Sequence, residues 1–262
     1  MPLDLVTIPC LQDNYAFLLH DAASGHTSLI DAPEATPILN ALAARGWRLD
    51  QILLTHHHSD HIQGVPELLA ATSARVLGAQ ADAHRLPPLT RALAEGDTVT
   101  IGPETAHVLD VSGHTMGHIA FHLAESALAF TADSLMAGGC GRLFEGSPAV
   151  MWQSLMKLAA LPGETRICSG HEYTTANLAF AAFIEPDNPA LQARIAKVAL
   201  ARAENRPTVP SRLAGELATN PFLRARLPHI KALIGMPDAT DAAAFAEIRA
   251  RKDNFRAPTI TF

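Results

Sequence analysis

The 262-residue sequence predicts an α/β layered fold that is followed by a helical region. Up to about residue 170, short apolar runs alternate with stretches of helical periodicity, which is the pattern of sheets covered by helices. Beyond Tyr173, almost all of the sequence has helical character. A chain of this length, with a hydrophobic content of 48%, buries a complete core without disulfide bonds. We therefore expect an α/β domain over residues 1–172 and a helical domain over residues 173–262.

Strands are expected where short runs of β-branched, aromatic and aliphatic residues are bounded by Gly, Pro, Asp or Asn. No internal repeat and no low-complexity linker divides these runs into separate units. In chain order the expected strands are Leu5–Pro9, Tyr15–Leu19, Thr27–Asp31, Gln51–Thr55, Thr98–Ile101, Ala106–Val111, Ile119–Leu123, Leu128–Thr131 and Arg166–Cys168.

Helices are expected between the strands at Glu34–Ala44, Ile62–Ala71 and Pro148–Ala160, where apolar residues recur with helical spacing. Ser147 is a good N-cap for the last of these, and proline suits the first helical position that follows it. Prolines divide the C-terminal region into shorter pieces. The longer helices expected there are Thr175–Ile184, Pro189–Glu204 and Ala242–Arg251.

Composition and charge exclude several classes of partner. The net charge of −6 disfavours a nucleic-acid-binding protein, which needs a broad basic surface to displace counterions. The longest stretch without Asp, Glu, Lys or Arg, Val111–Ala124, is shorter than the about 20 residues of a membrane-spanning helix. No secretory signal is visible, and the widely spaced Cys10, Cys140 and Cys168 suggest reduced thiols. We expect a cytoplasmic monomer that binds a small molecule, without nucleic-acid or membrane partners.

Histidine is clustered in this sequence, and the densest cluster, residues 56–61, directly follows an apolar strand. Side chains alternate along extended backbone, so His56 and His58 can point in the same direction at the end of that strand. Asp60 and His61 fall at the start of the next helix. Four ligand-type side chains that point in two directions suit two adjacent metal ions better than one.

Three further ligand-type residues, His114, Asp133 and His171, lie on turns after expected strands, where α/β layered proteins place their chemistry. Imidazole and carboxylate donors without thiolates fit Zn(II), Fe(II) or Mn(II). No Gly-x-Ser-x-Gly segment indicates a nucleophilic serine instead. The sequence therefore predicts a metal centre of histidines and aspartates.

The order His-x-His-x-Asp-His, His114, Asp133 and His171 resembles the metallo-β-lactamase superfamily. Further segments are similar to one branch of it, the glyoxalase II hydrolases (hydroxyacylglutathione hydrolases). These segments extend over nearly the whole chain. The histidine motif identifies only the superfamily, whereas the Cys-Gly-Arg and C-terminal Arg–Lys motifs are much more specific. These segments are Ile8-Pro9, Asp13-Asn14-Tyr15, Gly139–Gly146, His171–Thr174, Asn220-Pro221-Phe222 and Arg249–Asp253.

The resemblance implies an αββα sandwich with a C-terminal helical domain and two divalent metal ions per chain, with zinc favoured over iron or manganese. His57 and His118 are expected beside the site without binding a metal, and the thiols of Cys140 and Cys168 are expected to be buried. The implied ligands are His56, His58 and His114 for one ion and Asp60, His61 and His171 for the other, with Asp133 as the bridge.

The resemblance also implies the substrate, a thioester of the type S-(2-hydroxyacyl)glutathione, with S-D-lactoylglutathione as the expected member. Asp60 and Asp133 are the implied catalytic residues, and Asp60 is expected to help orient the attacking hydroxide. Glutathione carries two carboxylates and one ammonium group, so its recognition needs local positive charge. The implied substrate-binding residues are Arg142, Phe144, Tyr173, Arg249 and Lys252.

Three positions depart from the family pattern. The segment Asp31-Ala32-Pro33 replaces Asp-Pro-Gly, and we expect this to alter a turn without touching a metal ligand. Phe144 stands where relatives from higher organisms carry a tyrosine, so the hydrogen bond assigned to that hydroxyl is not expected here. Arg142 stands where some relatives have lysine, and it offers a fork of donors instead of a point charge.

Two other functions stay open. A glutathione-persulfide dioxygenase resembles the same branch and uses a single iron, held by two histidines and one aspartate. Such enzymes generally lack a long helical C-terminal domain. A non-catalytic binding module of the same fold is the second alternative, although degenerate members lose ligands and all seven ligand positions are filled here. A β-lactam hydrolase or a nuclease is less favoured, because a nuclease needs a basic surface and extra domains.

Overall fold

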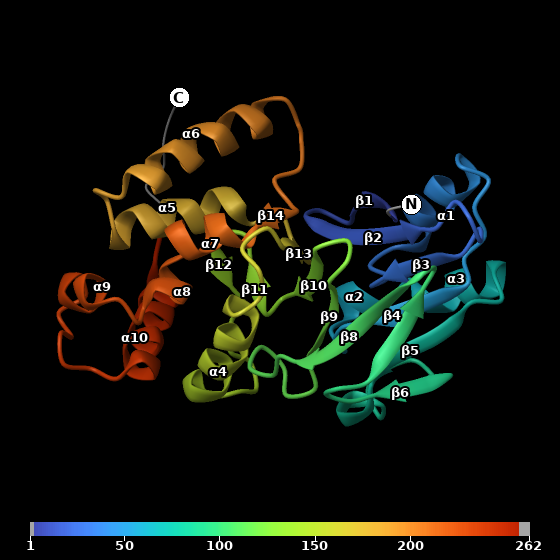
Figure 1. Cartoon of the computed structure of the whole chain (residues 1–262), viewed down its shortest axis with the longest axis horizontal. Coiled ribbons are helices and arrows are strands. Elements are labelled where there is room, and N and C mark those ends of the chain that lie inside the picture. The colour runs from blue at the N-terminus through green and yellow to red at the C-terminus, as the bar shows by residue number, and fades with distance from the viewer. Residues whose placement is uncertain (1–2, 257–262) are drawn as a thin grey trace.

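A computed structural model describes residues 3–256 and contains two six-stranded sheets (Figure 1). The first sheet has the strand order β1-β2-β3-β4-β5-β6. Its first three strands pair antiparallel, and its last four pair parallel. The strands are β1 (Asp4–Cys10), β2 (Asn14–His20), β3 (Thr27–Ile30), β4 (Gln51–Leu54), β5 (Arg75–Ala79) and β6 (Arg91–Leu93).

The second sheet has the order β14-β13-β10-β9-β8-β7 and is antiparallel except for the pair β10–β13. A short hairpin, β11–β12, follows β10 in the chain. The bounds are β7 (Thr98–Ile101), β8 (Glu104–Asp110), β9 (Ile119–Leu123), β10 (Leu128–Ala132), β11 (Leu135–Met136), β12 (Gly139–Cys140), β13 (Arg166–Ser169) and β14 (Ser211–Arg212).

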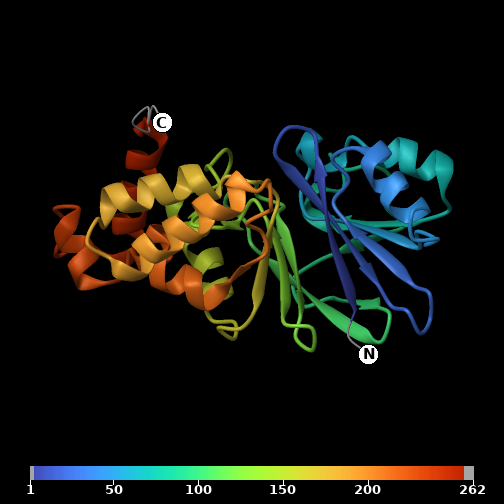
Figure 2. The same cartoon turned by 90° about the horizontal axis from the view of Figure 1, so that it is seen from above.

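Helices cover the outer faces of both sheets, with the N-terminal helices at one end of the molecule and the C-terminal helices at the other (Figure 2). A 3₁₀ turn, η1 (Gln80–Asp82), follows β5. The α-helices are α1 (Ala35–Ala43), α2 (Ser59–Ile62), α3 (Val65–Ala71), α4 (Pro148–Ala159), α5 (Thr174–Ile184), α6 (Pro189–Ala203), α7 (Leu213–Thr219), α8 (Pro221–Arg224), α9 (Pro228–Leu233) and α10 (Asp241–Asn254).

Three apolar clusters form the layers around the sheets, where side chains alternate along the strands, and a fourth lies between α5 and α6. In β2, Phe17 and Leu19 point between the two sheets, whereas Ala16 and Leu18 point to the layer under α1 and α3. The outer face of the second sheet packs against α4 and the C-terminal helices, with Phe245 of α10 in the same cluster. Because each sheet buries both faces, the layers stack as αββα, and the predicted fold class is confirmed.

The expected strands are all present, with bounds that shift by a few residues. The strands β5, β6, β11, β12 and β14 have no counterpart among the predictions, because they contain a glycine or are too short for a pattern. Ser147 caps α4 as predicted, accepting a hydrogen bond from the Val150 amide at 3.3 Å.

The single helix predicted over Ile62–Ala71 is wrong, because the chain forms α2 and α3 with a break at Gly64. A Cβ atom at Gly64 would lie 2.9 Å from the Ala32 carbonyl oxygen and from the Ala35 amide nitrogen. This close approach of two backbone segments needs glycine, and it bends the chain between the helices.

Two further expectations concern buried thiols and membrane spans. All three cysteines are free and buried, as predicted for Cys140 and Cys168. Across residues 3–256, the helices are too short or too polar to cross a membrane.

Candidate metal centre and substrate cavity

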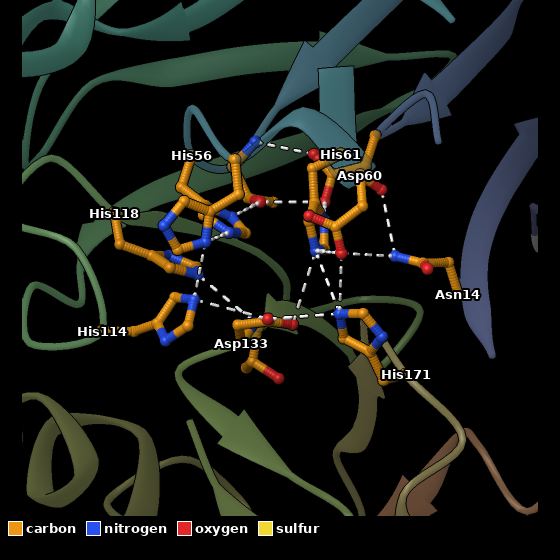
Figure 3. Close-up of polar contacts among 12 residues, drawn as sticks. Asn14, His56, Asp60, His61, His114, His118, Asp133 and His171 are labelled. Carbon is orange, nitrogen blue, oxygen red and sulfur yellow. Dashed lines mark hydrogen bonds and ion pairs between the residues drawn. The ribbon is translucent and has the colours of Figure 1, made fainter. Parts of the chain in front are cut away.

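The predicted ligands meet at one edge of the two sheets, in the segments that follow strands, with Asp60 and His61 in α2 (Figure 3). The first sheet supplies four of them through the segment between β4 and α3, and the second sheet supplies three. These are His56, His58, Asp60 and His61 from the first sheet, and His114 after β8, Asp133 after β10 and His171 after β13.

One group of three imidazoles converges on a common point. His58 Nδ1 lies 3.2 Å from His56 Nε2 and 3.0 Å from His114 Nε2. Burial lowers the pKa of all three imidazoles, so each is neutral at physiological pH and has a lone pair to donate. This trio can hold a metal ion.

A second group contains two imidazoles and a carboxylate. His61 Nε2 lies 3.3 Å from His171 Nε2, and Asp60 Oδ2 lies 3.4 Å from His171 Nε2 and 3.8 Å from His61 Nε2. These three donors form a second potential metal site.

Asp133 lies between the two groups. Its Oδ2 is 3.4 Å from His114 Nε2 in the first group and 3.3 Å from His171 Nε2 in the second, and its Oδ1 is 3.6 Å from His61 Nε2. Although burial opposes ionisation, His61 and His171 hold the pKa of Asp133 well below its usual range. Asp133 is therefore an anion that faces both groups.

The donor set fits a pair of divalent cations. Asp133 Oδ1 is buried and has no hydrogen-bond partner within residues 3–256, which is costly for a carboxylate oxygen. Within each group, ring nitrogens face one another at 3.0–3.3 Å, an arrangement that a cation bound by that group would stabilise. Imidazole and carboxylate ligands without thiolates are typical of dinuclear hydrolase centres.

The opposite ring nitrogens of the histidines are held by neighbouring acceptors. His61 Nδ1 lies 2.8 Å from Asp31 Oδ2, and His171 Nδ1 lies 2.9 Å from Asp13 Oδ1. His114 Nδ1 donates to a backbone carbonyl oxygen at 2.7 Å. Such contacts select the tautomer that leaves Nε2 free, and they fix the plane of each ring.

Two side chains, Asn14 and His118, contact the two aspartates of the centre. Asn14 Nδ2 donates to Asp60 Oδ2 at 3.0 Å, and also to the Asp60 carbonyl oxygen. The His118 ring stacks on His56, and its Nε2 accepts a 3.3 Å hydrogen bond from the Asp133 amide. Burial lowers the pKa of His118 to about 3, so it is a neutral acceptor.

A cavity of about 640 Å³ opens over the metal centre. Phe144 and Tyr173 stand at its rim, 60% and 39% exposed, and the Tyr173 ring stacks on His171 at 4.7 Å between centroids. Its wall also includes Arg142, Arg249 and Lys252, so all five predicted substrate-binding residues line this one cavity.

The three cationic residues of the wall differ in how much they are engaged by the protein. Arg249 is 7% exposed, and its two Nη atoms donate to the Cys140 carbonyl oxygen at 3.1 Å and to Asp253 Oδ1 at 2.8 Å. Lys252 Nζ donates to a carbonyl oxygen of α5 and lies over the Phe180 ring. The Arg142 side chain is 61% exposed. Arg249 is thus largely a structural cation, and the other two are more available to a ligand.

Comparison with known proteins gives the family. Residues 18–171 match the metallo-beta-lactamase superfamily, and residues 172–255 match the C-terminus of hydroxyacylglutathione hydrolase. A hydroxyacylglutathione hydrolase from Cereibacter sphaeroides strain ATCC 17025 is 68% identical over 255 residues, covering 97% of this chain and all of the relative. The chain belongs to the hydroxyacylglutathione hydrolase family.

Solved structures agree with this family's fold. ETHE1 from Myxococcus xanthus has a TM-score of 0.67 at 23% identity, over 99% of this chain and 93% of that one. TTHA1623, solved in a di-iron-bound form, has a TM-score of 0.56 at 31% identity, over 64% of this chain and 91% of that one. The metal centre of this hydroxyacylglutathione hydrolase family member is therefore built on a fold shared beyond the family.

One expectation about the departures from the family pattern is wrong. The turn at Asp31-Ala32-Pro33 does touch a ligand, because Asp31 accepts from His61 and the Ala32 amide donates to the His61 carbonyl oxygen at 2.7 Å. The strand β3 ends beside α2, which places this turn directly behind His61. The position of Asp31 at the end of an expected strand is the sequence feature from which this contact with the metal centre could have been predicted.

Sequence reasoning also missed Asp82, Arg85 and Asn177. Asn177 lines the cavity. Asp82 lies in η1 and Arg85 follows it, and both are beside residues 56–61, which we call the histidine segment. These three residues belong to no motif in which ligand-type residues recur at a typical spacing. Only the folding of the chain brings them to the site.

Proposed function

We propose that this protein hydrolyses S-(2-hydroxyacyl)glutathione thioesters, with S-D-lactoylglutathione giving D-lactate and glutathione. The observation that carries the proposal is the position of Asp133 between two three-donor groups, on the floor of a cavity lined by Arg142, Tyr173 and Lys252. The full-length relative from Cereibacter sphaeroides, which bears the name of this activity, supports it.

We propose that the two groups hold one divalent ion each and that Asp133 bridges them. When bound, such ions act as Lewis acids that lower the pKa of water and stabilise negative charge on a carbonyl oxygen. Zinc is the proposed metal, with iron or manganese as alternatives, and the di-iron form of TTHA1623 supports iron as a competitor. The ligands proposed are His56, His58 and His114; Asp60, His61 and His171; and Asp133.

Asp60 is proposed to orient the attacking water. Burial raises the pKa of Asp60, but His61 and the hydrogen bond from Asn14 hold it below its usual value. The carboxylate therefore stays ionised and accepts a hydrogen bond. The leaving group is a thiolate, whose conjugate acid has a pKa of about 8.5, so departure needs no strong general acid.

Recognition of glutathione falls to the cavity wall in this proposal. The glutathione part of the substrate carries two carboxylates, and Lys252 and Arg142 supply the accessible positive charge. Arg249 contributes indirectly, because its guanidinium donates a hydrogen bond to the carbonyl oxygen of Cys140 and so fixes the backbone there. The Tyr173 hydroxyl is available to the peptide, whereas Phe144 offers only an apolar face.

The domain boundary at residues 172 and 173 is proposed together with this function. The matches to the two family models meet at residues 171 and 172, and α5 begins shortly afterwards, at Thr174. The helical region then supplies α10, which carries two of the substrate-binding residues. The monomeric state and the cytoplasmic location stay predictions.

The decisive experiment measures thiol release from S-D-lactoylglutathione by the purified protein, followed with a chromogenic disulfide. We expect metal-dependent release that a chelator abolishes and added zinc restores. Oxygen uptake with glutathione persulfide, in the absence of thioester cleavage, would establish the single-iron dioxygenase instead. Tight glutathione binding without either reaction would establish the binding module.

A further inference from the structure

Four titratable side chains form an ion-pair cluster beside the metal centre, and none of them is a proposed metal ligand or substrate contact. We call His57, Asp82, Arg85 and Glu145 the Arg85 cluster. They come from three segments that are distant in sequence: the histidine segment, η1 with the turn after it, and the loop between β12 and α4.

Arg85 is the centre of this cluster. Its Nε lies 3.1 Å from Asp82 Oδ1, its Nη2 lies 3.2 Å from Glu145 Oε2, and further contacts between its Nη atoms and both carboxylates are closer still. His57 Nδ1 completes the cluster at 2.9 Å from Asp82 Oδ2, and its Nε2 lies 3.6 Å from Glu145 Oε1. One guanidinium therefore joins two carboxylates from separate segments.

The cluster runs from a buried carboxylate to the protein surface, where the side chains of Arg85 and Glu145 are 32% and 26% exposed. Asp82 is 1% exposed, and a Cβ atom at Gly117 would overlap its carboxylate, so the loop after His114 packs directly on Asp82. The hydrogen bond from Arg85 lowers the pKa of Glu145 to about 2, which keeps Glu145 anionic at neutral pH. The buried Asp82 carboxylate anchors the Arg85 guanidinium through charge-assisted hydrogen bonds, and Arg85 then pairs with Glu145 at the surface.

Glu145 belongs to the segment 141–146, which forms one side of the cavity mouth. Its Oε2 accepts a 2.7 Å hydrogen bond from the Met116 amide. The amides on either side of Glu145 continue this contact, because Phe144 donates to the His114 carbonyl oxygen at 3.2 Å and Gly146 to that of Gly113 at 3.0 Å. The segment is thus attached to the loop that carries His114.

The same segment places two residues of the proposed substrate site. The Phe144 ring meets His58 and His114 edge to face, with centroids 5.5 and 5.3 Å apart. Arg142 projects from the start of the segment, and its carbonyl oxygen accepts the His114 Nδ1 hydrogen at 2.7 Å. The side chains of Arg142 and Phe144 are mostly exposed to solvent, so their positions depend strongly on the backbone of this segment.

We propose that Arg85 is a positioning residue of the substrate site, which holds the segment 141–146 against the histidine segment and thereby sets Arg142 and Phe144 at the cavity mouth. This inference rests on the proposed function. Arg85 itself contacts neither metal ligands nor, in the proposal, substrate. A displacement of about 1 Å in a substrate-positioning group costs up to about 100-fold in rate, so a residue behind the site can govern recognition.

The test compares Arg85→Met with Arg91→Met, a matched control on β6. Arg91 is half-exposed and pairs with Asp97 at 3.9 Å, away from the cavity. In Arg85→Met we expect the KM for S-D-lactoylglutathione to rise about tenfold with metal content unchanged. A small lactoyl thioester without the glutathione peptide should be cleaved with less than about a twofold change. The KM of Arg85→Lys should lie between those of the wild type and Arg85→Met. Lysine keeps the positive charge but lacks the planar guanidinium that binds two carboxylates at once.

Amide hydrogen exchange supplies a readout that does not depend on turnover. In Arg85→Met, peptides that span 113–118 and 141–147 should exchange faster, while the rest of the chain and the Arg91→Met variant match the wild type. Glu145→Gln should give a smaller change in the same direction. The double variant Arg85→Met with Glu145→Gln should be no worse than Arg85→Met alone, because both remove the same link.

Three results would overturn the proposal: unchanged exchange in these peptides, an equal loss on both thioesters, or the same effect in the Arg91→Met control. Failure of the proposed function is recognised separately, because the wild type would then release no thiol from S-D-lactoylglutathione. Exchange in segment 141–147 would still decide whether Arg85 holds it. If Arg85→Met does not fold, Arg85→Lys and Glu145→Gln carry the same comparison.

Discussion

The metal centre and the substrate wall face the same cavity but are built differently. At the metal centre, His61 and His171 are each fixed by a carboxylate on the far side of the ring, and both are nearly inaccessible to solvent. On the wall, Lys252 is partly exposed and donates to the Ala176 carbonyl oxygen, and Arg142 is exposed and lies 3.5 Å from Asp253 Oδ1. Under the proposed function, this difference assigns the chemistry to preorganised donors and the recognition to positive charges that are exposed to the ligand.

The largest expected effect comes from breaking the metal centre itself. Asp133→Ala removes the carboxylate shared by both donor groups and leaves two cations facing each other with less neutralising charge. We expect loss of dinuclear binding and a fall in kcat/KM of at least about 100- to 1000-fold, with the fold retained. Metal analysis and circular dichroism test this. Two ions per chain with normal turnover would place the bridge elsewhere.

A smaller effect is expected when the donors are kept and only their support is removed. Asp31→Asn should weaken metal binding by about 10- to 100-fold, because the amide no longer offers His61 Nδ1 a charged acceptor. Competition with a chelator measures this affinity. KM for the thioester should be unchanged in the fully metal-loaded variant, so a change in KM alone would contradict the division between the two regions.

On the wall, Lys252→Ala should lower kcat/KM for the glutathione thioester about tenfold, mostly through KM, because it removes one charge-assisted contact. Cleavage of a small thioester and metal content should stay as in the wild type.

Arg249→Ala is the contrasting variant. Since its guanidinium holds Cys140 and Asp253, we expect a lower Tm as well as weaker recognition, measured by thermal unfolding beside kinetics.

The smallest expected effect is a pH dependence of recognition. Burial, and then the neighbouring Arg249, lower the pKa of Lys252 to about 8, with Asp253 and Cys140 as the other titratable groups that face it. The ammonium is charged below that pH and loses its proton above it, so affinity for a carboxylate falls as pH rises. Between pH 7 and pH 8.5 we expect KM to rise about threefold. Lys252→Arg stays charged and should show a flat profile over that range.

Much of the site could be predicted because its donors lie in short segments whose pattern depends only on neighbouring residues. Residues 56–61 follow a strand and enter a helix, and this alternation alone predicts donors pointing in two directions. The assignment to two groups came from the resemblance to a family, and the structure brings each trio together. The break at Gly64 escaped prediction, because it comes from a backbone approach to Ala32, a contact that no periodicity encodes.

By itself, the sequence determined the layered fold, the helical C-terminal region and the seven ligand-type residues, because strand alternation, helix periodicity and ligand spacing are properties of neighbouring residues. Only the tertiary structure decided the contacts between distant segments. Asp13 and His171 are 158 residues apart, and Arg85 and Glu145 are 60 apart. The tertiary structure also gave Arg249 a structural role, since Cys140 comes from a hairpin 109 residues earlier. Such pairs form because sheet order and layer packing bring loops to one edge, which is a global property of the folded chain.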